Sequence, residues 1–188
     1  MALDLAGALR RLKPEKRTQP LARRPDHAPR FVDQEQLAGP PLLLDTTVYI
    51  DVLQDRAPRA LEELLRVRQV NHSSVAVGEL VHNFGRLDPA HPGTKAVLTP
   101  IRKAVEGIPA HRLSTPSVQA VVEAGIVTGV IARLRGLPKT DRQPLMNDAT
   151  LVLQALESGF MLVTRNISDM DLIEQLVPTG RVLLYQQI

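Results

Sequence analysis

The sequence of 188 residues contains no cysteine and no tryptophan, and only three phenylalanines and two tyrosines. Without cysteine, the chain has no disulfide framework, no thiolate zinc site and no thiol nucleophile, and the cytoplasm is the default compartment. Aromatic residues make up 3% of the chain, which is too few for a protein that binds single strands by stacking their bases. No run approaches the roughly 18 uncharged apolar residues of a membrane span. We therefore expect a soluble cytoplasmic protein without a membrane partner.

The net charge of +3 comes from the N-terminal part of the chain. Residues 1–40 contain eight Lys and Arg against five Asp and Glu, whereas residues 41–188 contain 15 of each. Six prolines lie between positions 13 and 41 among charged residues, a composition that cannot bury enough surface to fold alone. We predict a basic, proline-rich arm over residues 1–40 and one folded domain over residues 41–188.

The arm itself has two interpretations. It is either a solvated tail or a segment that binds nucleic acid through its charges. Its first residues have the pattern of a short amphipathic helix, because Leu5, Leu9 and Leu12 share one face and Pro14 ends the pattern. That apolar face would instead favour docking or dimerisation.

After Pro41, short apolar runs alternate with helical patterns. The runs that we interpret as strands are residues 42–44, 70–75, 111–113, 161–163 and 182–184. Strands separated by helices predict a parallel sheet that is covered on both faces, and hence an α/β fold.

Two of the expected helices have clear end signals. One begins at Thr115-Pro116 and runs to about residue 135, with Gly125 and Gly129 one turn apart in a position that suggests close packing against a neighbour. The other begins with Asn147 as N-cap and ends at Gly159.

Polar residues follow the strands where a parallel sheet places its ligand site, beyond the carboxyl ends of the strands. Asp45 comes directly after the first strand, and Glu79 lies one turn into the helix after the second. Asp148 lies near the start of a helix, and Asp169 follows the strand that ends before Thr164. We expect these four carboxylates to converge on one edge of the sheet.

Each of these residues also has a purely structural explanation. Asp45 and Asp169 could serve as helix caps, and Asp148 could complement a helix dipole. Glu79 lies within an apolar helix face, where a carboxylate needs a partner. Their common placement at strand ends is what favours a functional site.

Carboxylates at short range resist ionising together, and a hard divalent cation removes that cost. Mg²⁺ or Mn²⁺ would bind carboxylate oxygens, activate a water molecule and stabilise the displacement of a phosphodiester. Thr47, Thr164 and Asn166 have hydroxyl and amide groups that could orient the carboxylates, metal-bound water or phosphate.

Other chemistries have less support. The sequence contains neither a dinucleotide-binding nor a P-loop glycine motif, and it has no serine nucleophile elbow. Haloacid-dehalogenase-like phosphatases need a second acid where Thr47 stands, and the acidic pair of receiver domains is not visible.

The chain resembles PIN-domain proteins, and in particular the ribonuclease toxins of VapBC toxin–antitoxin pairs, from about residue 41 to 188. The pieces that carry the resemblance are Leu-Leu-Leu-Asp-Thr-Thr-Val-Tyr-Ile at 42–50, Val-Gly-Glu-Leu at 77–80, Asn-Asp-Ala-Thr at 147–150 and Leu-Val-Thr-Arg-Asn-Ile-Ser-Asp at 162–169. The resemblance implies a three-layer α/β/α PIN-like fold around a parallel sheet of about five strands. It also implies a Mg²⁺- or Mn²⁺-dependent endoribonuclease that forms a homodimer and is inhibited by a cognate VapB-like antitoxin.

Carried over position by position, the resemblance assigns catalysis and metal binding to Asp45, Glu79, Asp148 and Asp169, with Thr47 and Asn166 in support. The chain differs from the family pattern in its 40-residue basic segment, in Met170 where an aromatic residue is common, and in Asp171, which competes with Asp169 for the fourth acidic position. The leading hypothesis is RNA cleavage by metal-activated water, as in a toxin. The alternative is a weakly active or inactive PIN-fold module that binds nucleic acid or a partner and is tethered by its arm.

Overall fold

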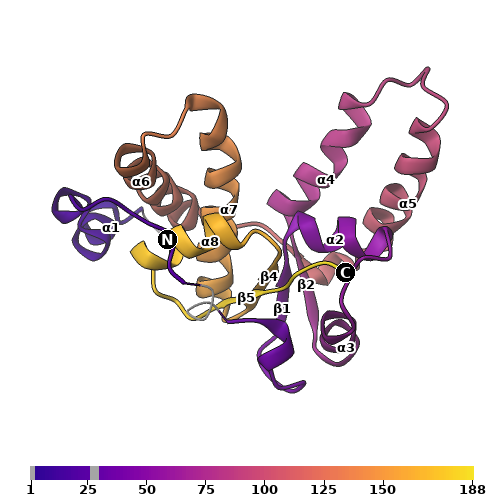
Figure 1. Ribbon diagram of the computed structural model, residues 1–188, viewed down its shortest axis with the longest axis horizontal. Helices are drawn as coiled ribbons and strands as arrows, with labels where there is room; N and C mark the ends of the chain where they lie inside the picture. The colour runs from indigo at the N-terminus through magenta and orange to yellow at the C-terminus, as the bar shows by residue number, and fades with distance from the viewer. Residues whose placement is uncertain (1–2, 26–29) are drawn as a thin grey trace.

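The computed structural model describes residues 3–25 and 30–188. This part of the chain contains a five-stranded sheet in the order β3-β2-β1-β4-β5, in which all neighbouring strands are parallel (Figure 1). The strands are β1 (Leu42–Leu44), β2 (Val70–Ser73), β3 (Leu113–Ser114), β4 (Met161–Thr164) and β5 (Val182–Leu184). The predicted parallel sheet of about five strands is confirmed. Strand β1 pairs with both β2 and β4, so the chain adds β2 and β3 on one side of β1 and β4 and β5 on the other.

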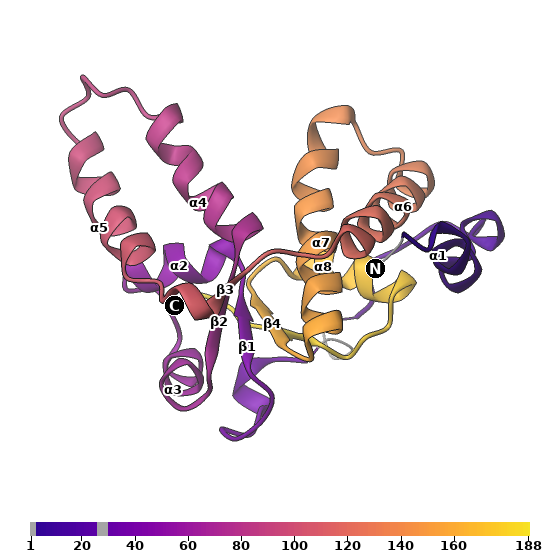
Figure 2. The same ribbon diagram turned by 180° about the vertical axis from the view of Figure 1, so that it is seen from behind.

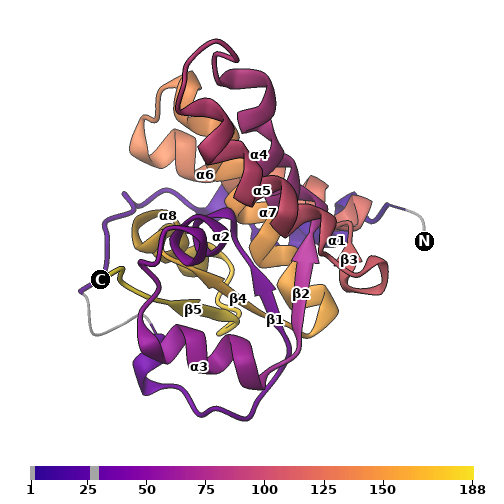
Figure 3. The same ribbon diagram turned by 90° about the vertical axis from the view of Figure 1, so that its right-hand side faces the viewer.

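Helices cover both faces of the sheet, as predicted for a three-layer α/β/α fold. Figures 1 and 2 show α6, α7 and α8 on one side, and α2, α3 and the α4–α5 hairpin on the other. Figure 3 views the sheet from the side that α3 covers. The helices of the domain are α2 (Thr46–Leu53), α3 (Arg59–Val67), α4 (Ser74–Arg86), α5 (Thr94–Glu106), α6 (Val118–Arg135), α7 (Arg142–Ser158) and α8 (Ile167–Leu176). Within residues 3–25 and 30–188, no helix combines the length and apolar character needed to cross a bilayer.

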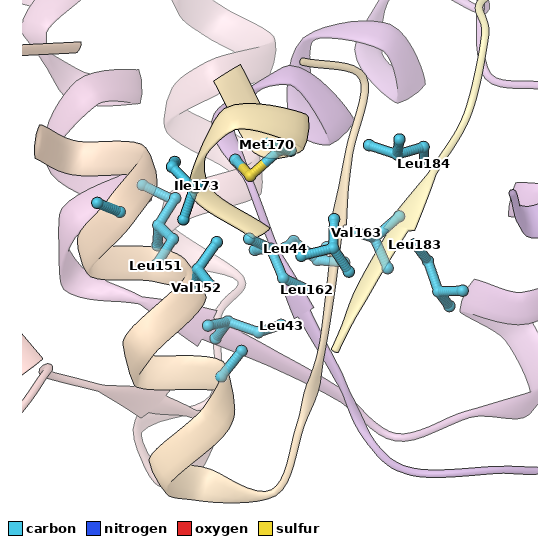
Figure 4. Packing of buried hydrophobic residues seen from close by; sticks show 14 of the residues in the cluster. Leu43, Leu44, Leu151, Val152, Leu162, Val163, Met170, Ile173, Leu183 and Leu184 are labelled. Carbon is cyan, nitrogen blue, oxygen red and sulfur yellow. The ribbon is translucent and has the colours of Figure 1, made fainter. Parts of the chain in front are cut away.

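The core is centred on β1, whose three leucines are all buried. Because helices cover both faces of this central strand, its sequence shows no apolar–polar alternation. Figure 4 shows how α7 contributes Leu151 and Val152, and α8 contributes Met170 and Ile173, to the side chains around the central strands. This packing holds the carboxyl ends of β1 and β4 next to the starts of α2 and α8.

Two helix starts differ from the sequence prediction. Helix α7 begins at Arg142, so Asn147 is an interior residue and not an N-cap. Pro144 lies in the first turn, where a missing backbone N–H breaks no intrahelical hydrogen bond. Helix α6 begins two residues after the predicted Thr115-Pro116 start, because the Ser117 side chain accepts the hydrogen bond from the Ala120 N–H. The predicted stop of α7 at Gly159 is confirmed, with φ 71° at that glycine.

The glycine pair of α6 does not pack closely against another part of the described chain. A Cβ added to Gly129 would meet no atom within 4 Å, and one added to Gly125 would meet only the methyl group of Met146, at 3.9 Å. Both glycines line an open groove of about 580 Å³ between α6 and α7. The expectation of close packing is therefore wrong within this chain.

The N-terminal segment lies against the domain wherever it is described. Helix α1 (Leu5–Leu12) contacts α6, and Phe31 forms a parallel bridge with Leu184 next to β5. Residues 1–2 and 26–29 of the predicted arm lie outside the described residues. The division at residue 40 remains a prediction, but the described part of this segment is not a detached tail.

Two arginines of the arm form ion pairs with buried carboxylates of the domain. Arg11 pairs with Glu123 of α6, and Arg24 pairs with Asp171 of α8 at 2.6 Å. The side chains of both acids are almost fully buried, and a buried carboxylate is strongly destabilising when it has no cationic partner. A part of the arm's positive charge therefore stabilises the fold.

The apolar face of α1 differs from the one predicted. Leu12 is only 6% exposed and Ala8 is fully buried, whereas Leu9 is 41% exposed. We expect Leu12→Ala to lower the free energy of unfolding by about 2–3 kcal/mol, because it removes a buried side chain. Leu9→Ala is the matched control and should cost less than about 1 kcal/mol. Urea denaturation measures both, and equal losses would show that α1 does not dock in this orientation.

Candidate functional site

Asp45 lies at the junction of β1 and α2, and both oxygens of its carboxylate accept hydrogen bonds. Its Oδ1 accepts a hydrogen bond from the Thr46 N–H at 2.7 Å, so the carboxylate caps α2. Its Oδ2 accepts hydrogen bonds from the hydroxyls of Thr47 and Thr164, both at 2.7 Å. The capping role considered from the sequence is real, and it coexists with a position at the carboxyl edge of the sheet.

Glu79 reaches the same edge from α4, the helix that follows β2. The Ser73 side chain caps this helix by accepting a hydrogen bond from the Val75 N–H at 3.1 Å. Oε2 of Glu79 accepts a hydrogen bond from the Thr46 hydroxyl at 2.5 Å, and Oε1 accepts one from the side-chain amide of Asn147. These contacts are the partners that a carboxylate on a largely apolar helix requires.

Asp148 and Asp169 come together through a single amide group. The side-chain amide nitrogen of Asn166 donates to Oδ2 of Asp148 at 2.7 Å and to Oδ2 of Asp169 at 2.9 Å. Asp148 lies in the second turn of α7, too far from the helix start for capping or for a strong dipole interaction. Asp169 lies in the first turn of α8, where Asn166 is the N-cap.

Asp171 points to a different set of partners. Its Oδ1 accepts a hydrogen bond from Nε of Arg24 at 2.6 Å, and its Oδ2 accepts from the Arg24 N–H at 2.8 Å and the Gln175 amide at 3.0 Å. Asp171 therefore anchors the N-terminal segment. Of the two candidates for the fourth acidic position, the geometry places Asp169 with the other carboxylates.

The supporting residues connect the β4–α8 turn to Asp45. The Thr47 hydroxyl oxygen accepts a hydrogen bond from the Arg165 N–H at 3.1 Å, and the Thr164 hydroxyl oxygen accepts one from the Asn166 N–H at 3.0 Å. Each hydroxyl thus receives a backbone hydrogen bond and donates its own proton to Asp45. This arrangement fixes the orientation of the Asp45 carboxylate.

The electrostatics of Asp148 reflect its burial and the three other carboxylates of the set. The pKa of Asp148 is raised to about 8, chiefly by burial and in addition by the charges of Asp45, Asp169 and Glu79. The hydrogen bond from Asn166 opposes this rise. Within the described residues, the charged groups that shift the pKa of Asp148 are thus all carboxylates, as expected where a cation is to be bound.

The donor set fits a hard divalent cation in its chemistry, because it offers carboxylate oxygens next to threonine hydroxyls. The side chains are not arranged as a ready-made coordination shell, however. Among residues 3–25 and 30–188, no three acidic or histidine side chains lie close enough together to hold a metal ion. The amides of Asn166 and Asn147 instead satisfy the carboxylate oxygens. A bound cation would replace some of these hydrogen bonds and would require side-chain rotation.

An open cleft gives access to one side of this cluster. It has a volume of about 680 Å³ and lies between α4 and α7. Glu79 and Asn147 contribute to its lining, together with Thr46, Gly78 and His82. A substrate in this cleft would contact Glu79 directly.

Thr46 and Asn147 are site residues that the sequence reasoning missed, since both bind Glu79. The sequence signal for Asn147 as a helix cap conceals this role, although an amide directly before Asp148 is itself a signal. Thr46 offered none, because the residue after an N-cap aspartate is often polar.

Comparisons with known proteins bear on the fold alone. No family model matches the sequence, and no curated protein matches it. Among solved structures, the chain is similar to one in FitAB bound to an IR36 DNA fragment, with 14% sequence identity and a TM-score of 0.50. The similarity covers 77% of this chain and 93% of the other. Together with the all-parallel five-stranded sheet, it supports a PIN-like fold.

Proposed function

We propose that this protein is a metal-dependent endoribonuclease that uses Mg²⁺ or Mn²⁺ at the cluster of Asp45, Glu79, Asp148 and Asp169. The observation that carries the proposal is Asp148, a buried carboxyl whose pKa is raised to about 8 while three further carboxylates act on it. The cluster lies at the carboxyl edge of a parallel sheet, where α/β folds bind their ligands. Such a concentration of negative charge is costly unless a cation binds there.

Each residue of the cluster would have a separate role in this reaction. Asp45 and Asp148 are the most buried of the four carboxylates and would hold the cation, while Asp169 and Glu79 would complete the acidic set from α8 and α4. A divalent cation supplies an activated water and stabilises charge on the phosphodiester. Thr47 and Thr164 orient Asp45, and Thr46 and Asn147 orient Glu79 toward the cleft.

The biological setting that we propose is a toxin–antitoxin pair. The sequence pieces that resemble VapC toxins contain all four carboxylates. The structural neighbour FitAB is described as bound to DNA, and an assembly of that kind would suit a toxin held by a DNA-binding partner. We accordingly propose a VapB-like antitoxin as partner, a homodimer as the active form and RNA as the substrate.

The first test is cleavage of a labelled RNA pool by the purified protein with Mg²⁺, with Mn²⁺ and with a chelator. We expect fragments with either metal and none with the chelator, because the proposed reaction depends on a metal-activated water. Calorimetric titration with Mn²⁺ should show binding that Asp148→Asn weakens at least about tenfold. Cleavage that persists in the chelator, or no cleavage with either metal once any antitoxin is removed, would refute the proposal.

One observation favours a second candidate, a PIN-fold binding module without turnover. The Asn166 amide already satisfies one oxygen each of Asp148 and Asp169. If this bridge is the functional state, Mn²⁺ should bind weakly and Asn166→Ala should not improve its binding. RNA binding without cleavage, together with that result, would favour the module.

A further inference from the structure

A second charged cluster lies at the same edge of the sheet, on the side of β5. At its centre is Asp51 of α2, whose side chain is fully buried. Oδ1 of Asp51 pairs with Nη2 of Arg56 at 3.1 Å, and Oδ2 pairs with Nε of Arg165 at 3.2 Å. The Tyr185 hydroxyl also donates to Oδ2, at 2.9 Å. We call these four residues the Asp51 cluster.

The Asp51 cluster contains more positive charge than is needed to neutralise the buried Asp51 carboxylate. One arginine and the phenol would suffice to neutralise and hydrogen-bond a single buried carboxylate. The chain uses two arginines, so the cluster has a formal charge of +1. The side chains of Arg56 and Arg165 are 38% and 31% exposed, so both remain partly open to solvent. A partly exposed arginine pair of this kind can bind an anion.

The position of Arg165 connects this cluster to the candidate active site. Arg165 stands between Thr164 and Asn166, whose side chains bind the site carboxylates. Its own backbone N–H donates to the Thr47 hydroxyl, which in turn donates to Asp45. The Arg165 side chain therefore starts at the rim of the acidic cluster and extends toward Asp51 instead.

The last residues of the chain contact both arginines, one through its side chain and one through its backbone. Nη1 of Arg165 donates to the side-chain oxygen of Gln187, and the Ile188 N–H donates to the Arg56 carbonyl oxygen at 3.2 Å. Residues 185–188 thus run beside the end of α2, as the label of the C-terminus in Figure 1 shows. Because Asp51 anchors both guanidinium groups, less conformational entropy is lost when they bind a ligand.

We propose that Arg56 and Arg165 form a subsite for a backbone phosphate of the nucleic acid, adjacent to the phosphate that is cleaved. The inference rests on the proposed nuclease function for its choice of ligand. The acidic cluster needs a cation to approach a polyanion, whereas the arginine pair binds one directly. A strand lying across the carboxyl edge of the sheet would meet both, with the flanking phosphate fixing its register.

The test measures binding without cleavage. A labelled single-stranded RNA is titrated in a chelator by fluorescence anisotropy, with wild type, Arg165→Gln and Arg59→Gln. Arg59 is the matched control because its side chain is 90% exposed on α3 and pairs only with Glu63 among the described residues. We expect Arg165→Gln to weaken binding on the order of tenfold. We also expect it to lower the salt dependence of binding by about 0.7 in the log–log slope, with little change for Arg59→Gln.

A phosphate scan locates the contact. Oligonucleotides in which one phosphate at a time is a neutral methylphosphonate should lose affinity for wild type at one position, and Arg165→Gln should be insensitive at that same position. The wild-type scan does not depend on the folding of any variant. A second variant, Arg165→Lys, keeps the positive charge but loses the planar guanidinium group, so this variant should bind RNA with an affinity between those of wild type and Arg165→Gln.

The outcomes separate this inference from the proposed function. Equal affinities of Arg165→Gln and Arg59→Gln, or a scan whose sensitive position persists in Arg165→Gln, would overturn the subsite. If wild type shows the arginine-dependent phosphate contact but cuts no RNA with Mg²⁺ or Mn²⁺, the subsite stands and the nuclease proposal fails. If it cuts RNA with no such contact, the reverse holds.

Discussion

Asp45→Asn is expected to lower metal-dependent RNA cleavage by at least about a hundredfold. The substitution removes the charge of the carboxylate that lies between β1 and α2. It also places an amide where Oδ2 accepts two threonine hydroxyls. Initial rates on a labelled RNA, at equal protein and metal concentrations, measure the effect.

The matched control for this substitution is Asp55→Asn. Asp55 is exposed in the turn after α2 and has a left-handed backbone conformation with φ 54°, which asparagine tolerates well. Asparagine at position 45 still caps a helix, so both variants should keep wild-type secondary structure and unfold cooperatively. Equal rates for Asp45→Asn and wild type would remove Asp45 from the catalytic set.

Asp148→Asn is expected to change how the stability of the metal-free protein depends on pH. The pKa of Asp148 is raised from 3.8 to about 8 in the folded chain, first by burial and then by Asp45, Asp169 and Glu79. Between these two values the folded protein keeps a proton that the unfolded chain releases. The free energy of unfolding therefore falls as the pH rises from about 4 to about 8, by roughly 5 kcal/mol from this group.

The variant should lose that contribution. At pH 4 wild type and Asp148→Asn should be similar in stability, and at pH 8 the variant should be the more stable, although it is expected to lose activity. Urea denaturation in a chelator at pH 4, 6 and 8 measures the difference, with Asp55→Asn expected to follow wild type. Parallel pH profiles for wild type and Asp148→Asn would contradict the raised pKa.

Metal binding should change with pH over the same range but in the opposite direction. A cation at the site requires the ionised form of Asp148, so Mn²⁺ should bind more tightly as the pH rises toward 8 and should release a proton when it binds.

The strands and the acidic residues could be predicted because their signals are local. The triple leucine of β1 is uninterrupted since the strand is buried on both faces, and Asp45 follows it directly. The rule that ligands bind at the carboxyl ends of parallel strands then grouped Asp45 with Glu79, Asp148 and Asp169. The structure places these four at the same edge of the sheet, and their catalytic and metal-binding roles remain predictions.

Other features depended on contacts that no local pattern encodes. Asp169 and Asp171 are two positions apart at the start of one helix, and only the packing of Arg24 against α8 shows which of them is structural. The start of α7 was misplaced because Asn147 has the residue type of a cap, whereas its amide binds Glu79.

By itself, the sequence determined the fold class, the order of the strands along the chain and the set of carboxylates at the sheet edge, because burial and strand–helix alternation are recorded residue by residue. Its excess of three positive charges suggested a free basic arm. Only the tertiary structure showed that Arg11 and Arg24 of this arm neutralise buried acids, while Arg56 and Arg165 of the neutral domain remain partly exposed. The physical reason is that a charge acts through its distance and burial, and both are set by residues far away in the sequence.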